Sequence, residues 1–156
     1  MREYTREKRF KTRSAAGTVA IAKTLAEMLC APRVVVLRGE LGAGKTTLVK
    51  GWVEALGAGK AEDVTSPTFT LVHEYARGRG EHAKERAKVY HLDLYRLETE
   101  RELATLGFEE MAEEPHAVVL VEWGEKFRSV LERADAEISL TPLEGDERAL
   151  HVVWRD

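Results

Sequence analysis

Residues 39–46 carry the clearest chemical pattern in the chain. They read G-E-L-G-A-G-K-T, which matches the pattern G-x-x-x-x-G-K-[ST] at every fixed position. Glycines in such a turn let the backbone wrap around a phosphate, because they have no side chain to collide with it. Lys45 can neutralise the β- and γ-phosphates, and the Thr46 hydroxyl can ligate a Mg²⁺ ion that bridges them. The pattern predicts a nucleoside-triphosphate site formed by Gly39, Glu40, Leu41, Gly42, Ala43, Gly44, Lys45, Thr46 and Thr47.

The segments on either side of this turn have the order that a phosphate site requires. Val34–Leu37 is a continuous apolar run, which is typical of a buried parallel strand. Residues 46–56 are expected to form the helix that follows the turn. In a strand–turn–helix unit the amides of the turn and of the helix N-terminus converge on one point, where an anion binds. The alternative is a glycine-rich turn that merely precedes a helix.

Phosphoryl chemistry also needs a carboxylate near the metal ion and a group that orders water. Two predicted strands supply candidates: the apolar run Ala117–Glu122 ends in a glutamate, and H-L-D-L-Y-R at residues 91–96 contains Asp93. In an extended chain His91, Asp93 and Tyr95 lie on one face. The alternatives are a solvated carboxylate at the end of a strand, an ordinary amphipathic strand, and a hydrogen-bonded His91–Asp93 pair.

A loop rich in hydroxyl groups lies after the helix that follows the glycine-rich turn. Residues 65–70 read T-S-P-T-F-T, and Pro67 stiffens the loop beside Thr65, Ser66 and Thr68. A hydroxyl loop at this point in the chain is placed like a switch that senses the γ-phosphate. The alternative is a turn that leads into a strand.

Length and composition are typical of one folded domain. The chain has 156 residues, of which 44% are hydrophobic and 33% charged, and its one cysteine rules out an internal disulfide. No apolar run approaches the roughly 18 residues of a membrane span, and residues 1–13 lack the apolar segment of a secretory signal. We therefore expect a cytoplasmic protein without membrane contact. A net charge of −3 argues against autonomous binding of nucleic acid, DNA included.

Hydrophobic periodicity and turn residues predict a single α/β domain. We expect a basic N-terminal arm over residues 1–13, followed by a P-loop nucleotide-binding domain over residues 14–156 with a mixed, largely parallel central sheet flanked by helices. The further expected elements are a helix from Ser14 to about Cys30, strands over Thr70–Tyr75 and Lys88–Tyr95, one or two helices within Thr99–Glu114 with a break near Gly107, a short helix within Gly124–Arg133, and closing strands at Ala136–Leu140 and Ala149–Trp154.

Four motifs occur in an order that resembles a known family. These are G-E-L-G-A-G-K-T-T, T-S-P-T-F-T-L-V-H-E-Y, Y-H-L-D-L-Y-R-L and L-V-E-W, and they fall between Ser14 and Trp123. Together they resemble the bacterial tRNA threonylcarbamoyladenosine biosynthesis ATPases, the TsaE family. The phosphate motif alone indicates no more than a nucleoside-triphosphate site.

The resemblance implies a P-loop ATPase that supports modification of the adenosine next to the anticodon of tRNA. The implied cofactors are ATP and Mg²⁺. The implied partners are a threonylcarbamoyl-transferase and its inactive paralogue, and tRNA is reached indirectly through that complex. The ATP cycle would sustain repeated turnover of the complex, whereas the group transfer itself belongs to the partner.

The resemblance also implies roles for single residues. Lys45, Asp93 and Glu122 would be catalytic, with Asp93 needed for hydrolysis, and Thr46 and Glu122 would coordinate Mg²⁺. The switch would consist of Thr65, Ser66 and Thr68. Because no built-in arginine finger is identifiable, slow hydrolysis by the isolated chain is expected. The alternatives from other functional classes are a small-molecule P-loop kinase and a nucleotide-gated binding module with negligible hydrolysis.

Overall fold

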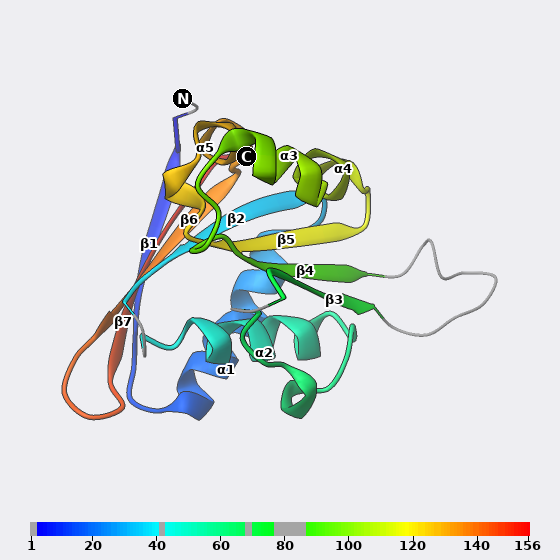
Figure 1. Ribbon diagram of the computed structural model, residues 1–156. Coiled ribbons are helices and arrows are strands. Elements are labelled where there is room, and N and C mark those ends of the chain that lie inside the picture. Colours follow the sequence, from blue (N-terminus) through cyan, green and yellow to red (C-terminus); the bar gives the residue numbers. More distant parts are fainter. Residues whose placement is uncertain (1–2, 41–42, 68–69, 77–86) are drawn as a thin grey trace.

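The computed structural model describes residues 3–40, 43–67, 70–76 and 87–156, which form a seven-stranded sheet with helices on both faces (Figure 1). The order of the strands across the sheet is β1-β7-β6-β2-β5-β4-β3. Their bounds are β1 Arg6–Thr12, β2 Arg33–Arg38, β3 Val72–Ala76, β4 Lys88–Asp93, β5 Ala117–Glu122, β6 Ala136–Pro142 and β7 Arg148–Trp154.

The centre of the sheet is parallel and its margins are antiparallel. Strands β6, β2, β5 and β4 run in the same direction, whereas β7 and β1 on one side and β3 on the other side pair antiparallel. The parallel strands β2 and β5 consist of apolar runs that are covered on both faces, which is the usual environment of parallel strands. This arrangement confirms the predicted α/β fold with a mixed sheet.

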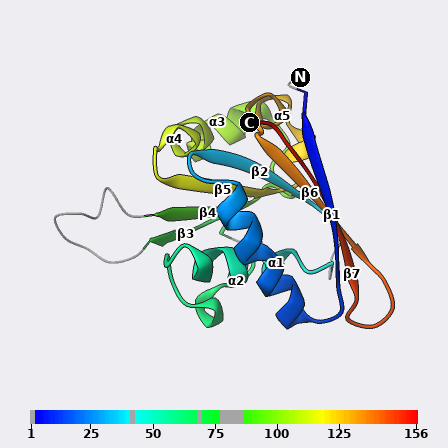
Figure 2. The same cartoon turned by 180° about the vertical axis from the view of Figure 1, so that it is seen from behind.

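The helices divide between the two faces of the sheet (Figures 1 and 2). Helices α1 (Ala15–Met28) and α2 (Lys45–Ala55) lie on one face, and the shorter helices α3 (Glu100–Leu106), α4 (Phe108–Glu113) and α5 (Arg128–Arg133) lie on the other. Two single-turn helices, η1 (Ala61–Asp63) and η3 (Gly124–Lys126), follow α2 and β5. No helix within the described ranges is long and apolar enough to cross a lipid bilayer.

Successive side chains of the central strands point to opposite faces of the sheet, so each face has its own hydrophobic core. In β2, Val35 and Leu37 pack under α1 and α2, whereas Val34 and Val36 pack under the opposite helices. Helices α1 and α2 pack closely because Gly51 has no side chain: a Cβ atom there would lie 2.5 Å from the Cβ of Ala22. This close contact fixes α2 against α1 on the same face of the sheet.

The basic N-terminal segment differs from its prediction. We expected residues 1–13 to form an arm, but Arg6–Thr12 is strand β1, which pairs along its whole length with β7. Phe10 and Thr12 turn inward on this strand, whereas the basic side chains are exposed. Charged side chains on an edge strand protect it from pairing with other chains, so their density does not indicate a free arm.

Candidate nucleotide-binding site

The turn between β2 and α2 needs glycine at two described positions. A Cβ atom on Gly39 would lie 2.9 Å from the carbonyl oxygen of Leu140 and 3.0 Å from the Cβ of Ala43. Gly44 has a φ of 104°, in the left-handed region that side chains disfavour, and α2 begins immediately after it. Leu41 and Gly42 of the predicted phosphate site lie outside the described residues, whereas the exposed Glu40 accepts a hydrogen bond from the amide of Ala43 at its carbonyl. Helix α2 therefore begins directly after a turn whose backbone requires glycine at positions 39 and 44.

An arginine from the far end of the chain supports this turn. The Nε of Arg148, at the start of β7, donates a hydrogen bond of 3.1 Å to the carbonyl of Ala43. Its Nη1 binds the carbonyls of Gly145 (3.0 Å) and Glu147 (2.8 Å). Sequence reasoning missed Arg148, because no local pattern links two residues that are 105 positions apart. The phosphate motif is thus braced by the β6–β7 hairpin.

The two predicted carboxylates meet at the ends of adjacent parallel strands. Asp93 and Glu122 are register partners across β4 and β5, and both are buried. The strands stay together beyond this point, since the Leu94 amide donates to the Glu122 carbonyl at 3.0 Å. Ligands of open α/β sheets bind beyond the carboxyl ends of the strands, which is where these groups lie.

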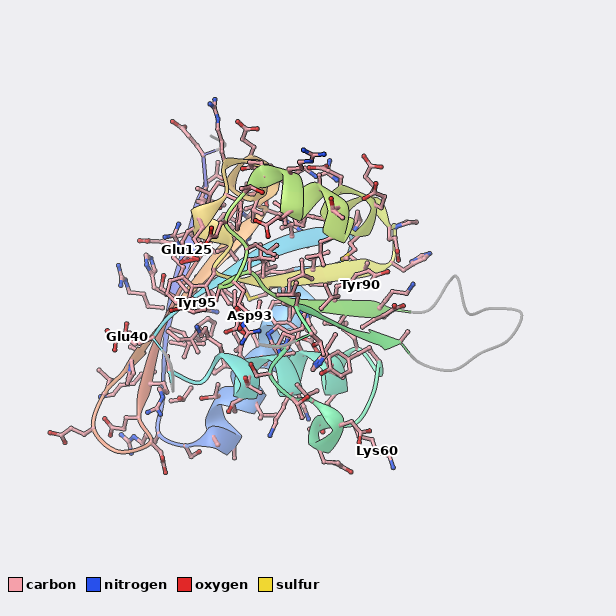
Figure 3. The ribbon with its side chains drawn as sticks, in the orientation of Figure 1. Glu40, Lys60, Tyr90, Asp93, Tyr95 and Glu125 are labelled. Carbon is pink, nitrogen blue, oxygen red and sulfur yellow. The ribbon has the colours of Figure 1, made fainter. Side chains whose placement is uncertain are left out.

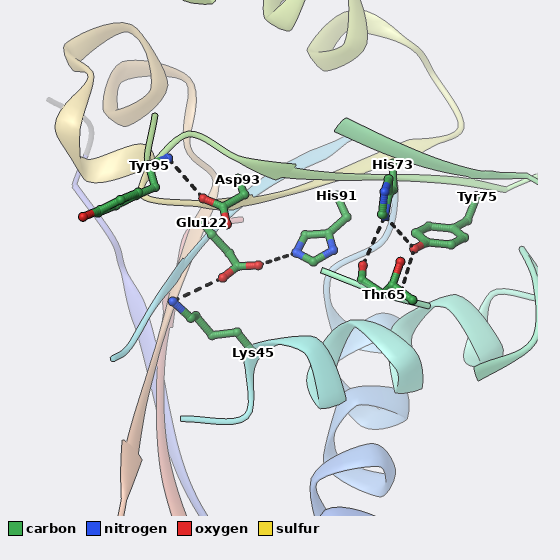
Figure 4. Close-up of polar contacts among 8 residues, drawn as sticks. All are labelled: Lys45, Thr65, His73, Tyr75, His91, Asp93, Tyr95 and Glu122. Carbon is green, nitrogen blue, oxygen red and sulfur yellow. Dashed lines mark hydrogen bonds and ion pairs between the residues drawn. The ribbon is translucent and has the colours of Figure 1, made fainter. Parts of the chain in front are cut away.

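The carboxylate of Glu122 is held by two basic groups from different elements (Figure 4). Lys45 Nζ, on α2, lies 3.2 Å from Oε1 of Glu122, and His91 Nε2, on β4, lies 2.6 Å from Oε2. Burial alone would raise the pKa of Glu122. The hydrogen bond from His91 and the neighbouring ammonium group of Lys45 outweigh burial, so this pKa lies below its ordinary value and the carboxylate is ionised at neutral pH.

The alternative of a His91–Asp93 pair is wrong in this structure. His91 binds Glu122, which lies diagonally across from it on β5, a geometry that long side chains on one face of a sheet can bridge. Asp93 instead accepts a hydrogen bond of 3.1 Å from the Tyr95 amide at its Oδ1. That turn ends the strand at Asp93, two residues earlier than predicted.

Lys45, Asp93 and Glu122 border one cavity of about 840 Å³. This is within the roughly 300–1,000 Å³ range of small-molecule and cofactor sites. Its walls consist of Ala15, Gly44, Lys45, Thr46, Thr47, Ser66, Asp93, Tyr95, Glu122, Trp123, Asp146 and Arg148. The structure therefore brings the described end of the phosphate motif, both predicted carboxylates and one predicted switch residue to the same space. The sequence reasoning had not placed Ala15, Asp146 or Arg148 there.

Two aromatic side chains lie beside the carboxylates at this cavity. Tyr95 is 60% exposed and Trp123 37%, and their ring centres are 5.2 Å apart (Tyr95 is labelled in Figure 3). Trp123 has a φ of 62°, which turns the chain sharply after β5, and Lys45 Nζ lies 5.7 Å from the centre of its ring. The rings meet because each follows a carboxylate at the end of one of two adjacent strands.

The predicted hydroxyl switch is only partly at the cavity. Ser66 lines it, whereas Thr65 is not among its wall residues and Thr68 lies outside the described residues. The backbone of Thr65 is fixed by β3: its carbonyl lies 3.1 Å from His73 Nδ1, and its amide donates to the Tyr75 hydroxyl at 3.4 Å. The segment is thus attached to the edge strand by its backbone while Ser66 faces the site.

The donor set fits a nucleotide-bound Mg²⁺ better than a metal ion held by protein alone. Among the described residues no group of three or more His, Cys, Asp or Glu could hold a metal. Mg²⁺ usually takes one or two protein ligands and completes its shell with phosphates and water. Thr46 and Glu122 border the same cavity, but Oε1 of Glu122 already contacts Lys45. Among the described residues the protein therefore offers these two groups at the cavity but no complete set of metal ligands of its own.

Comparison with known proteins points to one family. Residues 12–150 match the family described as "Threonylcarbamoyl adenosine biosynthesis protein TsaE". The chain is 38% identical over 141 residues to the tRNA threonylcarbamoyladenosine biosynthesis protein TsaE of Treponema pallidum, covering 90% of this chain and 96% of that one. For the Bacillus subtilis protein of the same name the identity is 37% over 142 residues, and the coverages are 91% and 82%.

Further comparisons agree in sequence and in fold. The relative of the same name from Nostoc is 44% identical over 113 residues, which span 70% of this chain and 64% of that protein. A solved structure titled "Crystal structure of Bacillus subtilus YdiB" superposes with a TM-score of 0.69 at 29% identity, covering 97% of this chain and 87% of that chain. With a family match over most of its length and relatives that share its fold, this chain belongs to the TsaE family of threonylcarbamoyl adenosine biosynthesis proteins.

Proposed function

We propose that this chain is a Mg²⁺-dependent ATPase that supports threonylcarbamoyladenosine modification of tRNA at the adenosine next to the anticodon. Membership of the TsaE family supports the pathway. A cavity bordered by a strand–turn–helix phosphate motif and two strand-end carboxylates supports the nucleotide chemistry. The choice of ATP over GTP rests on the resemblance to the family, because no residue that reads the base is evident.

The observation that carries the proposal is the ion pair between Lys45 and Glu122 at the cavity wall. Both side chains are nearly buried, with 10% and 7% exposed, so the ammonium group is held at the site but is poorly solvated. A triphosphate offers several negative charges to this group, and charge-assisted contacts strengthen where water is excluded. The ammonium group of Lys45 would therefore leave Glu122 and pair with the β- and γ-phosphates when ATP binds.

The remaining roles follow from position. The amides at the start of α2 and the hydroxyls of Thr46 and Thr47 would hold the phosphates, and Thr46 and Glu122 would hold Mg²⁺, whose chemistry is to neutralise developing charge on the phosphate oxygens. Asp93 faces the same cavity and would orient the attacking water. Ser66 would contact the γ-phosphate and so act as the sensing residue of the switch formed by Thr65, Ser66 and Thr68.

The partners would be the threonylcarbamoyl-transferase and its inactive paralogue, with tRNA reached indirectly through them. In our proposal the nucleotide-bound face docks on that complex, and hydrolysis releases it, so that the complex turns over repeatedly. Arg96, which follows Asp93 in its motif, is exposed and is not a wall residue of the cavity, and Arg148, which is a wall residue, binds backbone carbonyls of Ala43 and Gly145. Hydrolysis by the isolated chain should thus be slow and should rise when the partners are present.

The test is a tRNA threonylcarbamoylation assay from purified components, run with wild type, Lys45→Ala or no chain. Product should stall near one equivalent of transferase without the chain or with Lys45→Ala, and should continue with wild type. Lys11→Ala is a matched control, because Lys11 forms an exposed pair with Glu147 at 3.8 Å, on strand β1. Equal product without the chain would overturn the proposal. Transfer of the γ-phosphate to a metabolite instead of water would favour a kinase.

A further inference from the structure

His91 contacts the candidate site from behind, and the proposed function gives it no role. The residue is fully buried on β4 and does not border the cavity. Its Nε2 lies 2.6 Å from Oε2 of Glu122, a short contact between a ring nitrogen and an ionised carboxylate. Because an ionised carboxylate only accepts hydrogen bonds, His91 is the donor.

The two oxygens of Glu122 therefore differ in their surroundings. Oε2 is bound within the protein by a side chain that packs in the sheet, whereas Oε1 contacts Lys45, which borders the cavity. In the proposed function ATP draws Lys45 away, and Oε1 then loses its positively charged neighbour. A carboxylate attached only through Lys45 would be free to rotate at that moment. With His91 in place, one oxygen stays fixed.

The His91 ring has a buried polar atom that a residue serving only to fill space in the core would not need. Its second nitrogen, Nδ1, is buried and has no hydrogen-bond partner among the described residues. An unsatisfied buried polar atom costs free energy, which an apolar side chain of similar size would avoid. The contact with Glu122 is the compensating interaction that the structure shows. This is the pattern of a group that orients another group.

We propose that His91 is a positioning residue for Glu122. It holds Oε2 so that Oε1 points into the cavity both when Lys45 is paired with it and when Lys45 has moved to phosphate. When Lys45 has moved to phosphate, Oε1 is already placed to bind Mg²⁺ or to accept a hydrogen bond from a water molecule bound to Mg²⁺. This inference rests on the proposed function, because it concerns the same nucleotide site.

The experiment compares three substitutions at one position. His91→Gln keeps an amide donor at about the place of Nε2. His91→Asn has the same amide on a shorter side chain that does not reach Glu122, and His91→Phe has no donor. The matched control is His151→Phe, because His151 forms a similar 2.8 Å contact with Glu7 between β7 and β1, away from the cavity. Thermal unfolding establishes that each variant is folded before it is assayed.

The first readout is ATP affinity by calorimetry with and without Mg²⁺. Loss of the His91–Glu122 contact should leave the affinity for ATP without Mg²⁺ as in wild type. It should reduce the increase in ATP affinity that Mg²⁺ provides by about 10-fold to 100-fold, as for other residues that orient metal ligands. His91→Asn and His91→Phe should show this loss, whereas His91→Gln and His151→Phe should resemble wild type. If His91→Phe fails to fold, the Asn and Gln variants still decide the question.

The second readout is a double-mutant cycle with Glu122→Gln. If His91 acts through Glu122, His91→Asn causes no further loss of Mg²⁺-dependent affinity or hydrolysis once Glu122 is replaced. Losses that multiply, or an Asn variant that binds ATP·Mg²⁺ as wild type does, would overturn the inference. A wild-type chain that binds no ATP would instead overturn the proposed function, so the two failures are distinguishable.

Discussion

Two histidine–glutamate pairs in this protein have nearly the same geometry and opposite environments. His91 on β4 and Glu122 at the end of β5 are 2.6 Å apart, and both side chains are buried. His151 and Glu7 are 2.8 Å apart between β7 and β1, where the side chains are 33% and 62% exposed. In each pair the hydrogen bond from histidine favours the ionised glutamate and contributes to a lowered pKa.

The difference between the pairs lies in what surrounds them. Water competes for the exposed pair, so its members gain little from each other. At the buried pair the carboxylate has left water and depends on His91 and Lys45 for compensation. A ligand that attracts Lys45 changes that balance, whereas nothing comparable acts on Glu7. The same chemical pair is therefore a surface contact at one place and part of a candidate site at the other.

The largest difference between the His91–Glu122 pair and the His151–Glu7 pair should appear in the rate of ATP hydrolysis. Glu122→Ala should lower Mg²⁺-dependent ATP hydrolysis by about 100-fold or more, the scale on which removal of one preorganised electrostatic contact acts in enzymes. Some ATP binding should persist, because Lys45 and the turn remain. Glu7→Ala should hydrolyse ATP at the wild-type rate. Phosphate release in the presence of the partner complex measures both, and normal turnover of Glu122→Ala would exclude this carboxylate from the mechanism.

A smaller difference is expected in stability without nucleotide. Glu122→Ala leaves His91 and Lys45 without their carboxylate and should lower the free energy of unfolding by about 1–3 kcal/mol. The lower part of that range is favoured because Lys45 borders the cavity and can regain water. Urea unfolding of Glu122→Ala and Glu7→Ala tests this, with Glu7→Ala close to wild type. Equal losses in the two variants would remove the distinction between the pairs.

The smallest difference concerns pH and salt. A carboxylate with a lowered pKa stabilises the fold above its unfolded pKa, near 4.5, and this stabilisation is lost as pH falls through the folded value. The stability gap between wild type and Glu122→Gln should thus shrink below about pH 4.5. At 1 M salt the Debye length is about 3 Å. The difference in unfolding free energy between wild type and Glu122→Gln should persist there, whereas the small difference between wild type and Glu7→Ala should vanish. A gap for Glu122 that is independent of pH would contradict its ionisation.

The local parts of the fold were predictable from the sequence because each rests on a local pattern. Apolar runs identified β2 and β5, and the glycine motif placed the turn before α2. The break between α3 and α4 falls at Gly107, which adopts a φ of 90° that few other residues accept. The predicted arm was wrong, because the pairing of β1 with β7 joins the two ends of the chain and leaves no local signal.

Sequence motifs marked some of the residues that border the cavity but none of the contacts between them. Lys45, Asp93 and Glu122 were each marked by a motif, and all three border the cavity. The partner of His91 depends on β4 and β5 being neighbours and on their register, neither of which a single sequence contains. Arg148 likewise reaches Ala43 only once the β6–β7 hairpin is placed beside the turn.

The most direct test of a nucleotide site at the Lys45–Glu122 pair is thermal unfolding with increasing ATP·Mg²⁺. A ligand that binds only the folded chain stabilises it by about 2.7 kcal/mol at 100 times its dissociation constant. Wild type and Lys11→Ala should show a Tm that rises with ATP·Mg²⁺, and Lys45→Ala should show little rise over the same range. A wild-type Tm that ATP·Mg²⁺ does not change, or an equal rise in Lys45→Ala, would contradict the assignment of this pair to nucleotide binding.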